Sequence, residues 1–281
     1  MPLPDQFDTD DFVARVLAED LGRGGDVTSN ATIAADARFT AQMNARQAIV
    51  VAGLDIAAAF FRKFDADVRI EMLASDGDAV DPRSALMRLE GNARAMLAAE
   101  RSALNTLQHL SGIATLTRQY VNEIAGTGAT LLDTRKTIPG LRVLEKYASR
   151  MGGAQNQLMR LDDGVLIKDN HVAVCGGVAE AVRRAKAANT GLQVQVEVDR
   201  IDQIEPALAA GADRLLLDNM PAHVLREAVA LVSKRVPLEA SGGVTLETIR
   251  EIAESGVDFI SVGRITQSAQ AVDIGLDYST I

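Results

Sequence analysis

LLDTRKTIPG (131–140) and VLIKDNH (165–171) are the two stretches that decide the fold of the carboxyl-terminal half. Each begins as a short apolar segment that predicts a β-strand, and each runs into cations: Arg135 and Lys136 after the first, Lys168 after the second. In an α/β barrel the carboxyl ends of the strands gather the catalytic residues. The stretches therefore predict a mouth for a polyanionic substrate, and the alternative is Lys and Arg on solvated loops.

Similar segments recur to the end of the chain. Apolar strands are expected to finish at six positions, each followed by a helical pattern: Thr134, Lys168, Val198, Asp218, Ser241 and Gly263. Successive ends lie 20 to 34 residues apart, which is compatible with βα units. Six units are fewer than the eight of a complete barrel. We therefore expect residues 116–281 to form a partial, partly open α/β barrel that carries the active site.

The first 115 residues have a different pattern. Residues 8–21 have the apolar spacing of a helix, and residues 38–92 predict strands around one helix. Residues 93–126 continue with a long helical pattern that we expect to break near Ser111-Gly112. The fold class predicted for the chain is α/β, with an amino-terminal α/β sandwich domain over 1–115. The last helix of the barrel can pack back on this first domain.

The composition excludes several classes of protein. The chain has 281 residues, 47% of them apolar and 24% charged, as in a soluble globular protein. Its net charge of −9 is opposite to the basic face of a nucleic-acid-binding protein. No apolar run approaches the ~20 residues that span a bilayer, and the amino terminus is acidic, unlike a signal peptide. Because Cys175 is the only cysteine, an intramolecular disulfide is impossible, and we expect a cytoplasmic protein.

Polar residues at the later strand ends supply further chemistry. Glu197 and Asp218 could hold Mg²⁺ that carries a diphosphate, or sugar hydroxyls, because hard oxygen ligands suit that ion. Two glycine turns, each followed by a helix, are candidate phosphate grips: Ser241, Gly242 and Gly243 in the first, Gly263 in the second. Two such turns on consecutive βα units are the usual phosphate site of a barrel.

The sequence also resembles the nicotinate-nucleotide diphosphorylase (carboxylating) family, also called quinolinate phosphoribosyltransferase. The segments that carry the resemblance are EDLGRGGDVTS (19–29), AERSALNTLQHLSGIATLT (99–117), LLDTRKTIPGLRVLEKYA (131–148), LIKDNH (166–171), VEVD (196–199), LLLDN (215–219), EASGGV (239–244) and SVGRIT (261–266). The match runs from about residue 19 to 277, nearly the whole chain. DTRKTIPGLR and LIKDNH are highly specific in combination.

The resemblance implies an activity and an assembly. The family joins quinolinate to 5-phosphoribosyl diphosphate with Mg²⁺, releases CO₂ and diphosphate, and forms nicotinate mononucleotide for NAD synthesis. It also implies a homodimer in which Arg101 reaches the active site of the neighbouring subunit. The expected partners are therefore these two small-molecule substrates and a second copy of the chain, without nucleic acid or membrane.

Site residues carry over position by position. By resemblance, quinolinate carboxylates are gripped by Arg101, Arg135 and Lys168. Lys136 lies between the carboxylates and the diphosphate, and Glu197 and Asp218 face the ribose hydroxyls and the metal. The 5′-phosphate is held by Ser241, Gly242, Gly243 and Gly263. The four residues expected to be catalytic are Lys136, Lys168, Glu197 and Asp218.

The chain departs from the family pattern at MGGAQNQL (151–158) and at TQSA (266–269). Ala154 replaces a glycine, Gln157 and Leu158 stand where His and Arg of the quinolinate pocket are expected, and Gln267 replaces a His at the phosphate end. A charged hydrogen bond contributes roughly 1.5–3 kcal/mol. Losing two could weaken transition-state binding by about 3–5 kcal/mol, on the order of 10²- to 10⁴-fold.

Three interpretations follow from these departures. The chain is a family member impaired at its quinolinate pocket, a paralogue that uses a different acceptor, or a non-catalytic ligand-binding protein. We favour the first, because DTRKT, LIKDNH and the phosphate side all persist. Arg160, in a position that is usually small, is a candidate for a replacement guanidinium.

Overall fold

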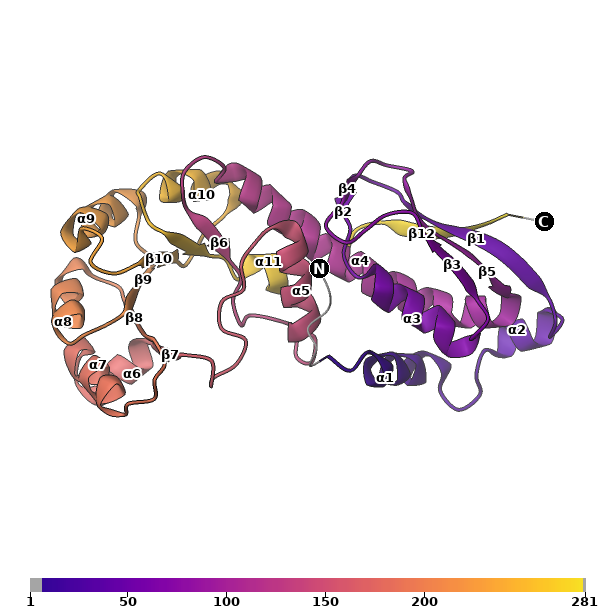
Figure 1. Cartoon of the computed structure of the whole chain (residues 1–281), viewed down its shortest axis with the longest axis horizontal. Helices are drawn as coiled ribbons and strands as arrows, with labels where there is room; N and C mark the ends of the chain where they lie inside the picture. The colour runs from indigo at the N-terminus through magenta and orange to yellow at the C-terminus, as the bar shows by residue number, and fades with distance from the viewer. Residues whose placement is uncertain (1–6, 280–281) are drawn as a thin grey trace. The chain divides into compact units, whose positions relative to one another are not determined.

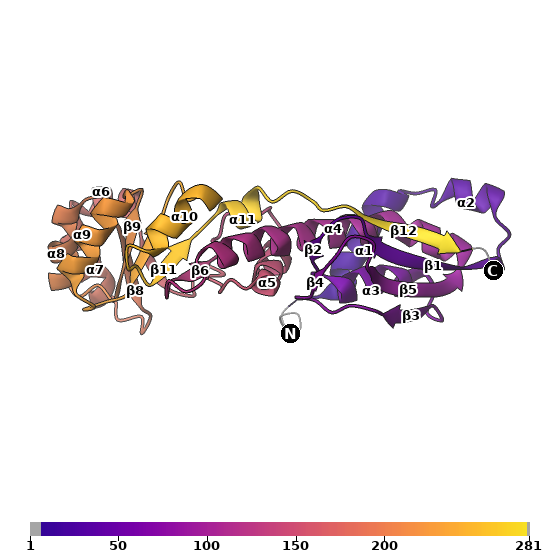
Figure 2. The same cartoon turned by 90° about the horizontal axis from the view of Figure 1, so that it is seen from above.

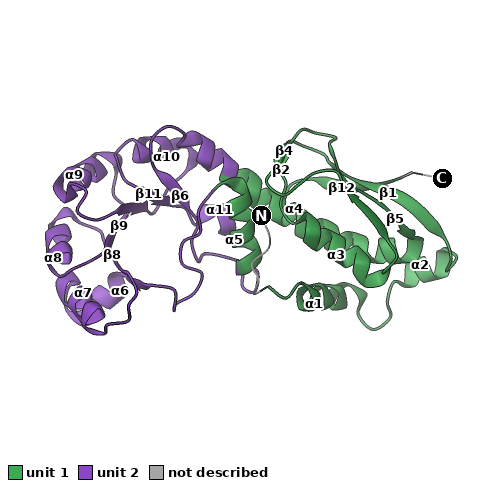
Figure 3. Cartoon of the chain, viewed as in Figure 1, with its two compact units in different colours: residues 1–117, 143–153, 268–281 green, residues 118–142, 154–267 purple. Residues whose placement is uncertain are grey.

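The structure, a computed structural model, describes residues 7–279, which form two compact units (Figure 3). Unit 1 comprises residues 1–117, 143–153 and 268–281, and unit 2 comprises residues 118–142 and 154–267. The expected α/β class is confirmed, with one antiparallel and one parallel main sheet. No helix within the described range is both long and apolar enough to cross a membrane.

Unit 1 contains an antiparallel sheet in the order β12-β1-β5-β3, a two-stranded sheet β2-β4, and helices. Its elements are α1 (Thr9–Leu21), α2 (Val27–Thr32), β1 (Arg38–Ala45), β2 (Ile49–Val50), α3 (Leu54–Phe64), β3 (Arg69–Met72), β4 (Ala79–Val80), β5 (Ala85–Asn92), α4 (Ala93–Glu123, up to Thr117), α5 (Arg142–Gly152, from Val143) and β12 (Ile274–Ser279). The expected sandwich of strands and helices in the first part of the chain is present.

The last segment of the chain joins the sheet of unit 1 as a strand. β12 pairs antiparallel with β1 over six residue pairs (Figure 2). The expectation that the last helix packs back on the first domain stays a prediction: the last helix, α11 (Arg264–Gln267), belongs to unit 2, and the segment that joins the sheet of unit 1 is a strand. A strand is favoured here because the free edge of β1 offers unpaired N–H and C=O groups that only another strand can satisfy in register.

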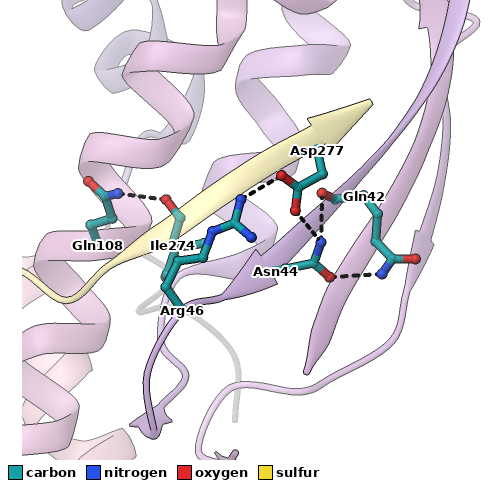
Figure 4. Close-up of polar contacts among 6 residues, drawn as sticks. All are labelled: Gln42, Asn44, Arg46, Gln108, Ile274 and Asp277. Atoms are coloured by element: carbon teal, nitrogen blue, oxygen red, sulfur yellow. Dashed lines mark hydrogen bonds and ion pairs between the residues drawn. The ribbon is translucent and has the colours of Figure 1, made fainter. Parts of the chain in front are cut away.

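Side chains reinforce the attachment of β12 (Figure 4). Asp277 accepts a hydrogen bond from Nδ2 of Asn44 at 2.8 Å and pairs with Arg46. Gln108, on α4, donates from Nε2 to the carbonyl oxygen of Ile274 at 2.7 Å. These contacts fix the register of the returning strand at both of its ends.

The long helix α4 is unbroken from Ala93 to Glu123, so the break expected near Ser111-Gly112 is wrong. A Cβ atom placed on Gly112 would lie 2.1 Å from the carbonyl oxygen of Gln270. Ser111 is fully buried, and its Oγ accepts the N–H of Ala52 at 3.0 Å. The two small residues therefore do not end the helix. They allow the segments around Gln270 and Ala52 to pack closely against it.

Helix α5 belongs with unit 1, although the sequence places it after the first barrel strand. The hydroxyl of Tyr147 donates to Asp76, and Glu145 pairs with His109 at 2.9 Å. Lys146 is also fully buried. The single boundary expected between residues 115 and 116 therefore does not describe the compact units, because buried polar contacts hold α5 against unit 1.

Unit 2 contains six parallel strands and the helices between them. Its elements are β6 (Thr130–Leu132), β7 (Val165–Ile167), α6 (Asp169–Cys175), α7 (Val178–Ala187), β8 (Val194–Val198), a 3₁₀ turn (Ile201–Gln203), α8 (Ile204–Ala209), β9 (Arg214–Asp218), α9 (Ala222–Val232), β10 (Leu238–Ser241), α10 (Leu246–Ala253), β11 (Phe259–Ser261) and α11. The strand order is β6-β11-β10-β9-β8-β7, and every pairing between them is parallel.

The six strands form a curved sheet with α7 to α10 on its outer side (Figure 1). β6 and β7 lie at its two edges and do not pair with each other, so the predicted partly open barrel is confirmed. Side chains alternate between the two faces, as in any strand. Leu215 and Leu217 of β9 are buried on the helix side, whereas Leu216 and Asp218 line a cavity on the inner side.

Gly112→Ala should destabilise the protein, because the new methyl group has no room beside the backbone of Gln270. We expect a loss of about 1–3 kcal/mol, the usual cost of overpacking, despite the better helix propensity of Ala. The measurement is urea unfolding followed by circular dichroism. Gly24→Ala is the matched control, because its Cβ would make only an ordinary contact at 3.7 Å. Equal stability of the variant and the parent protein would contradict this packing.

Candidate active site

A cavity of about 630 Å³ lies within unit 2 at the carboxyl ends of the parallel strands. The candidate residues of unit 2 all line it: Arg135, Lys136, Gln157, Leu158, Lys168, Glu197, Asp218, Ser241, Gly242, Gly243 and Gly263, together with Gln267. Arg101 is an exposed residue of α4 in unit 1 and is not among the lining residues. The sequence therefore located the cavity, while the role of each residue stays a prediction.

Two carboxylates and a lysine, Glu197, Asp218 and Lys168, line the cavity together. Nζ of Lys168 lies 3.6 Å from Oε2 of Glu197. Burial raises the pKa of Glu197, and Lys168 opposes that rise. Burial also raises the pKa of Asp218, whose carboxylate accepts a hydrogen bond from Asn219 at 2.7 Å. The two acids are thus held partly out of water, where an interaction with a bound cation or hydroxyl is strengthened.

Lys168 directly follows β7 and is held by the first turn of α6. Its backbone N–H donates to Nδ1 of His171 at 2.9 Å. His171 therefore holds the backbone of Lys168 at the start of α6.

Lys136 follows β6 and lies against the second glycine turn. A Cβ atom on Gly263 would lie 2.7 Å from Cδ of Lys136, so a larger residue would displace the lysine. Oγ1 of Thr266 donates to the carbonyl oxygen of Lys136 at 2.7 Å. The loop after β6 and the start of α11 are therefore held together, and they bring the lysine to the predicted phosphate side.

The first glycine turn requires glycine for two reasons. Gly242 has a φ of +92°, which L side chains rarely adopt. A Cβ atom there would also lie 2.2 Å from Oδ1 of Asn219. The turn after β10 therefore packs directly on the end of β9, and this packing leaves backbone atoms of Gly242 and Gly243 at the cavity surface.

The segment that carries Gln157 and Leu158 is anchored by a buried acid. Gln155 forms a parallel bridge with Leu132 and so extends the sheet beyond β6. The N–H of Gln157 donates to Oδ1 of Asp133 at 2.8 Å, and Asn156 donates to the other oxygen. Asp133 is fully buried. It positions the segment without lining the cavity itself.

The side chain of Gln157 belongs to a polar cluster beneath the cavity. Its Nε2 donates to Glu239, which is fully buried. Glu239 also accepts from Nε2 of Gln195 at 2.8 Å and pairs with Arg214 at 2.8 Å. Three groups from β8, β9 and the segment before β7 thus meet one carboxylate of β10.

The remaining departures lie in different surroundings. Leu158 lines the cavity and rests on Gly164, where an added Cβ would lie 2.9 Å from its Cδ2. Ala154 is buried. Arg160 pairs with Asp162 at 2.9 Å and with Asp163, and it does not line the cavity, so its role as a replacement guanidinium stays a prediction.

Sequence reasoning missed several residues of this site. Arg264 lines the cavity directly after Gly263, although its position in the predicted turn was a usable signal. Glu239 and Asp133 could have been found as acids within otherwise apolar strands. In all, four cations and three acids line the cavity: Arg135, Lys136, Lys168 and Arg264 against Asp169, Glu197 and Asp218. Within the described residues, no three His, Cys, Asp or Glu side chains are grouped to hold a metal by themselves.

Comparisons with known proteins agree along nearly the whole chain. Residues 26–111 match the family model described as quinolinate phosphoribosyl transferase, N-terminal domain, and residues 113–277 match the model of the C-terminal domain. The nicotinate-nucleotide pyrophosphorylase [carboxylating] of Mycobacterium leprae is 42% identical over 272 residues, which are 95% of this chain and 96% of that protein.

Solved structures show the same likeness. The nicotinate-nucleotide pyrophosphorylase from Francisella tularensis is similar with a TM-score of 0.93 and 39% identity, over 99% of this chain and 100% of that chain. The enzyme of the same name from Ehrlichia chaffeensis gives a TM-score of 0.94 and 40% identity, over 98% and 100%.

The raised pKa values of the cavity acids predict a pH-dependent gain in stability for Glu197→Gln. A carboxyl group whose pKa is higher in the folded state stabilises below its unfolded pKa, and that contribution is lost as the pH rises through the folded pKa. Glutamine cannot ionise, so the variant should melt about 2 °C higher at pH 7 and show less gain near pH 4.

Thermal melts at the two pH values make this measurement. Asp202→Asn, at an acid with a side chain 74% exposed, is the control and should change little. A lower melting temperature of Glu197→Gln at pH 7 would mean that the pair with Lys168 outweighs the burial of the acid.

Proposed function

The chain belongs to the quinolinate phosphoribosyltransferase family, and from this premise we propose that it transfers the phosphoribosyl group of 5-phosphoribosyl diphosphate to quinolinate. The products are nicotinate mononucleotide, diphosphate and CO₂, which places the reaction in NAD biosynthesis. The observation that carries the proposal is one cavity that combines cations, two partly buried acids and two glycine turns.

The reaction needs two kinds of electrostatic support. The ring nitrogen of quinolinate forms a bond to C1′ of the ribose while the bond from C1′ to the diphosphate oxygen breaks. Positive charge develops on the sugar and negative charge on the leaving group. Glu197 and Asp218 suit the sugar, and Lys136 suits the diphosphate, because fixed charges in a partly desolvated site stabilise developing charge strongly.

Loss of CO₂ then leaves an electron pair on the ring carbon, which takes up a proton. Nearby cations stabilise this developing negative charge. Arg135 and Lys168 line the same cavity and are proposed to hold the acid substrate, while the turns at Gly242 and Gly263 are proposed to hold the 5′-phosphate through backbone N–H groups.

Magnesium is proposed to enter together with the phosphoribosyl diphosphate. Two carboxylates, Glu197 and Asp218, line the cavity, and Mg²⁺ is commonly bound by one or two carboxylates plus substrate phosphates. The donor set therefore fits that ion, which would neutralise charge on the diphosphate. The cytoplasm is the proposed compartment, in keeping with a chain that has one cysteine.

Purified protein should release one diphosphate and one CO₂ for each quinolinate consumed, in the presence of Mg²⁺ and phosphoribosyl diphosphate. Lys136→Ala should lower kcat about 10²- to 10³-fold, the usual loss when one electrostatic group of a transition state is removed. Lys63→Ala, at an exposed lysine of unit 1, is the matched control. Binding of both substrates without diphosphate release would support a non-catalytic binding protein.

A homodimer is the proposed assembly, with Arg101 contributed to the partner's site. A hollow of about 280 Å³ in unit 1 is lined mainly by apolar residues: Ile33, Phe39, Ala93, Leu97, Glu100, Leu276 and Tyr278. Leu97 is 38% and Tyr278 is 75% exposed, and burial raises the pKa of Glu100. Leu97 and Arg101 are one helical turn apart on α4, so a second copy that covers the hollow would also contact Arg101.

Subunit mixing tests this shared site. Arg101→Ala and Lys168→Ala should each be nearly inactive alone. After mixing in equal amounts, half of the dimers contain one of each subunit, and each of these has one intact site. Activity should therefore recover to about a quarter of the parent level. No recovery, with exchange of subunits verified by mass, would place Arg101 in its own subunit's site or outside any site.

A further inference from the structure

Gln157 presents a hydrogen-bond acceptor to the cavity. Glu239 pairs with Arg214 at 2.8 Å and accepts a hydrogen bond from Nε2 of Gln195 at 2.8 Å. The amide of Gln157 also turns its NH₂ group toward Glu239, because its Nε2 donates to this carboxylate. The remaining polar atom of this cavity-lining side chain is the carbonyl oxygen Oε1, which cannot donate.

Leu158 and Leu166 form an apolar part of the lining of the same cavity. Both line the cavity: Leu166 is the middle residue of β7, and Leu158 rests on Gly164 just before the same strand. Neither can hydrogen bond or carry charge. This end of the cavity therefore offers no partner to a carboxylate, and burying an unpaired charge there is unfavourable.

The cations at the acceptor end come from the neighbouring strand ends instead. Lys168 follows β7, and its Nζ also pairs with Oε2 of Glu197 at 3.6 Å. Arg135 follows β6 and lines the same cavity. Together with the Arg101 that is proposed to come from the partner subunit, they can pair with one carboxylate, and a second carboxylate that faced Gln157 and the two leucines would find no partner. The acceptor end is therefore built for a ring with one anionic edge and one neutral edge.

We propose that the cavity also accepts an aromatic nitrogen heterocycle that carries a single carboxylate, and phosphoribosylates it without releasing CO₂. Nicotinate is the simplest such compound. The inference rests on the proposed phosphoribosyl transfer, since it uses the same donor and the same cavity. The inference goes beyond the proposed function because it names a different acceptor and a reaction without decarboxylation.

The reaction balances without another reactant. The lone pair of the ring nitrogen forms the bond to C1′, and the bond from C1′ to the diphosphate oxygen breaks with its electron pair on the diphosphate. The single ring carboxylate stays in place, so no carbon loses CO₂ and none takes up a proton. Nicotinate and phosphoribosyl diphosphate give nicotinate mononucleotide and diphosphate.

The test compares nicotinate with quinolinate as acceptors for the full-length protein with Mg²⁺ and phosphoribosyl diphosphate. Diphosphate release, CO₂ release and nucleotide formation are measured separately. We expect kcat/KM for nicotinate to equal or exceed that for quinolinate. Gln157→His with Leu158→Arg returns donors to the neutral edge, so it should shift the preference about tenfold or more toward quinolinate, mainly through a lower KM for quinolinate.

The matched control is Gln155→His with Leu161→Arg. These are the same replacements in the same segment, at an exposed glutamine and at a leucine that is 82% exposed, and neither residue lines the cavity. An equal shift in the control would overturn the inference, and so would a parent protein that prefers quinolinate more than tenfold. Diphosphate release with quinolinate alone would leave the proposed function standing, whereas release with neither acceptor would overturn both.

Discussion

A buried carboxylate must be surrounded by donors, and Glu239 imposes this constraint on the whole active-site half. It has no exposed surface and accepts hydrogen bonds or ion pairing from Gln157, Gln195 and Arg214. Removing Arg214 would leave a charge unpaired in a region shielded from water, which usually costs several kcal/mol, whereas removing either glutamine would take away one hydrogen bond. The contacts link β8, β9 and β10 to the segment that spans the open side of the sheet. The cavity above them therefore rests on one polar anchor.

The acids above this anchor have the opposite energetic role. Burial raises the pKa of Glu197 and of Asp218, so keeping them ionised at neutral pH opposes folding. A wall with only a structural role would have apolar residues at these two positions. Leu216, which pairs with Glu197 across the sheet and precedes Asp218 by two residues on β9, is such an apolar residue in the same cavity lining. Polar groups that reduce stability and converge on a cavity are typical of a site that acts on a ligand.

Much of this architecture could be predicted from sequence, because parallel strands have a local signature. Apolar runs that end in Lys168 or Asp218 predicted both the open barrel and the side on which the cavity lies. The failures concern contacts between distant segments. Gly112 was read as a helix break because the approach of Gln270 cannot be seen in sequence, and the pairing of β12 with β1 joins residues more than 200 positions apart. Arg264 was not predicted to line the cavity, because the phosphate grip expected in this turn was assigned to Gly263, the residue before it.

Gln157 and Leu158, the two departures from the family pattern at the acceptor end, are both accommodated by the residues that contact them. Gln157 supplies one of the three contacts that the buried carboxylate of Glu239 receives, and Leu158 rests on Gly164, which has no side chain in its way. A random loss of function more often leaves an unsatisfied polar group or a void, and either would destabilise the surrounding core. Here the neighbouring residues fit the substitutions in shape and in hydrogen bonding. This fit favours an acceptor end with a different preference over one that is merely weakened, because weakening alone gives no reason for the surroundings to match.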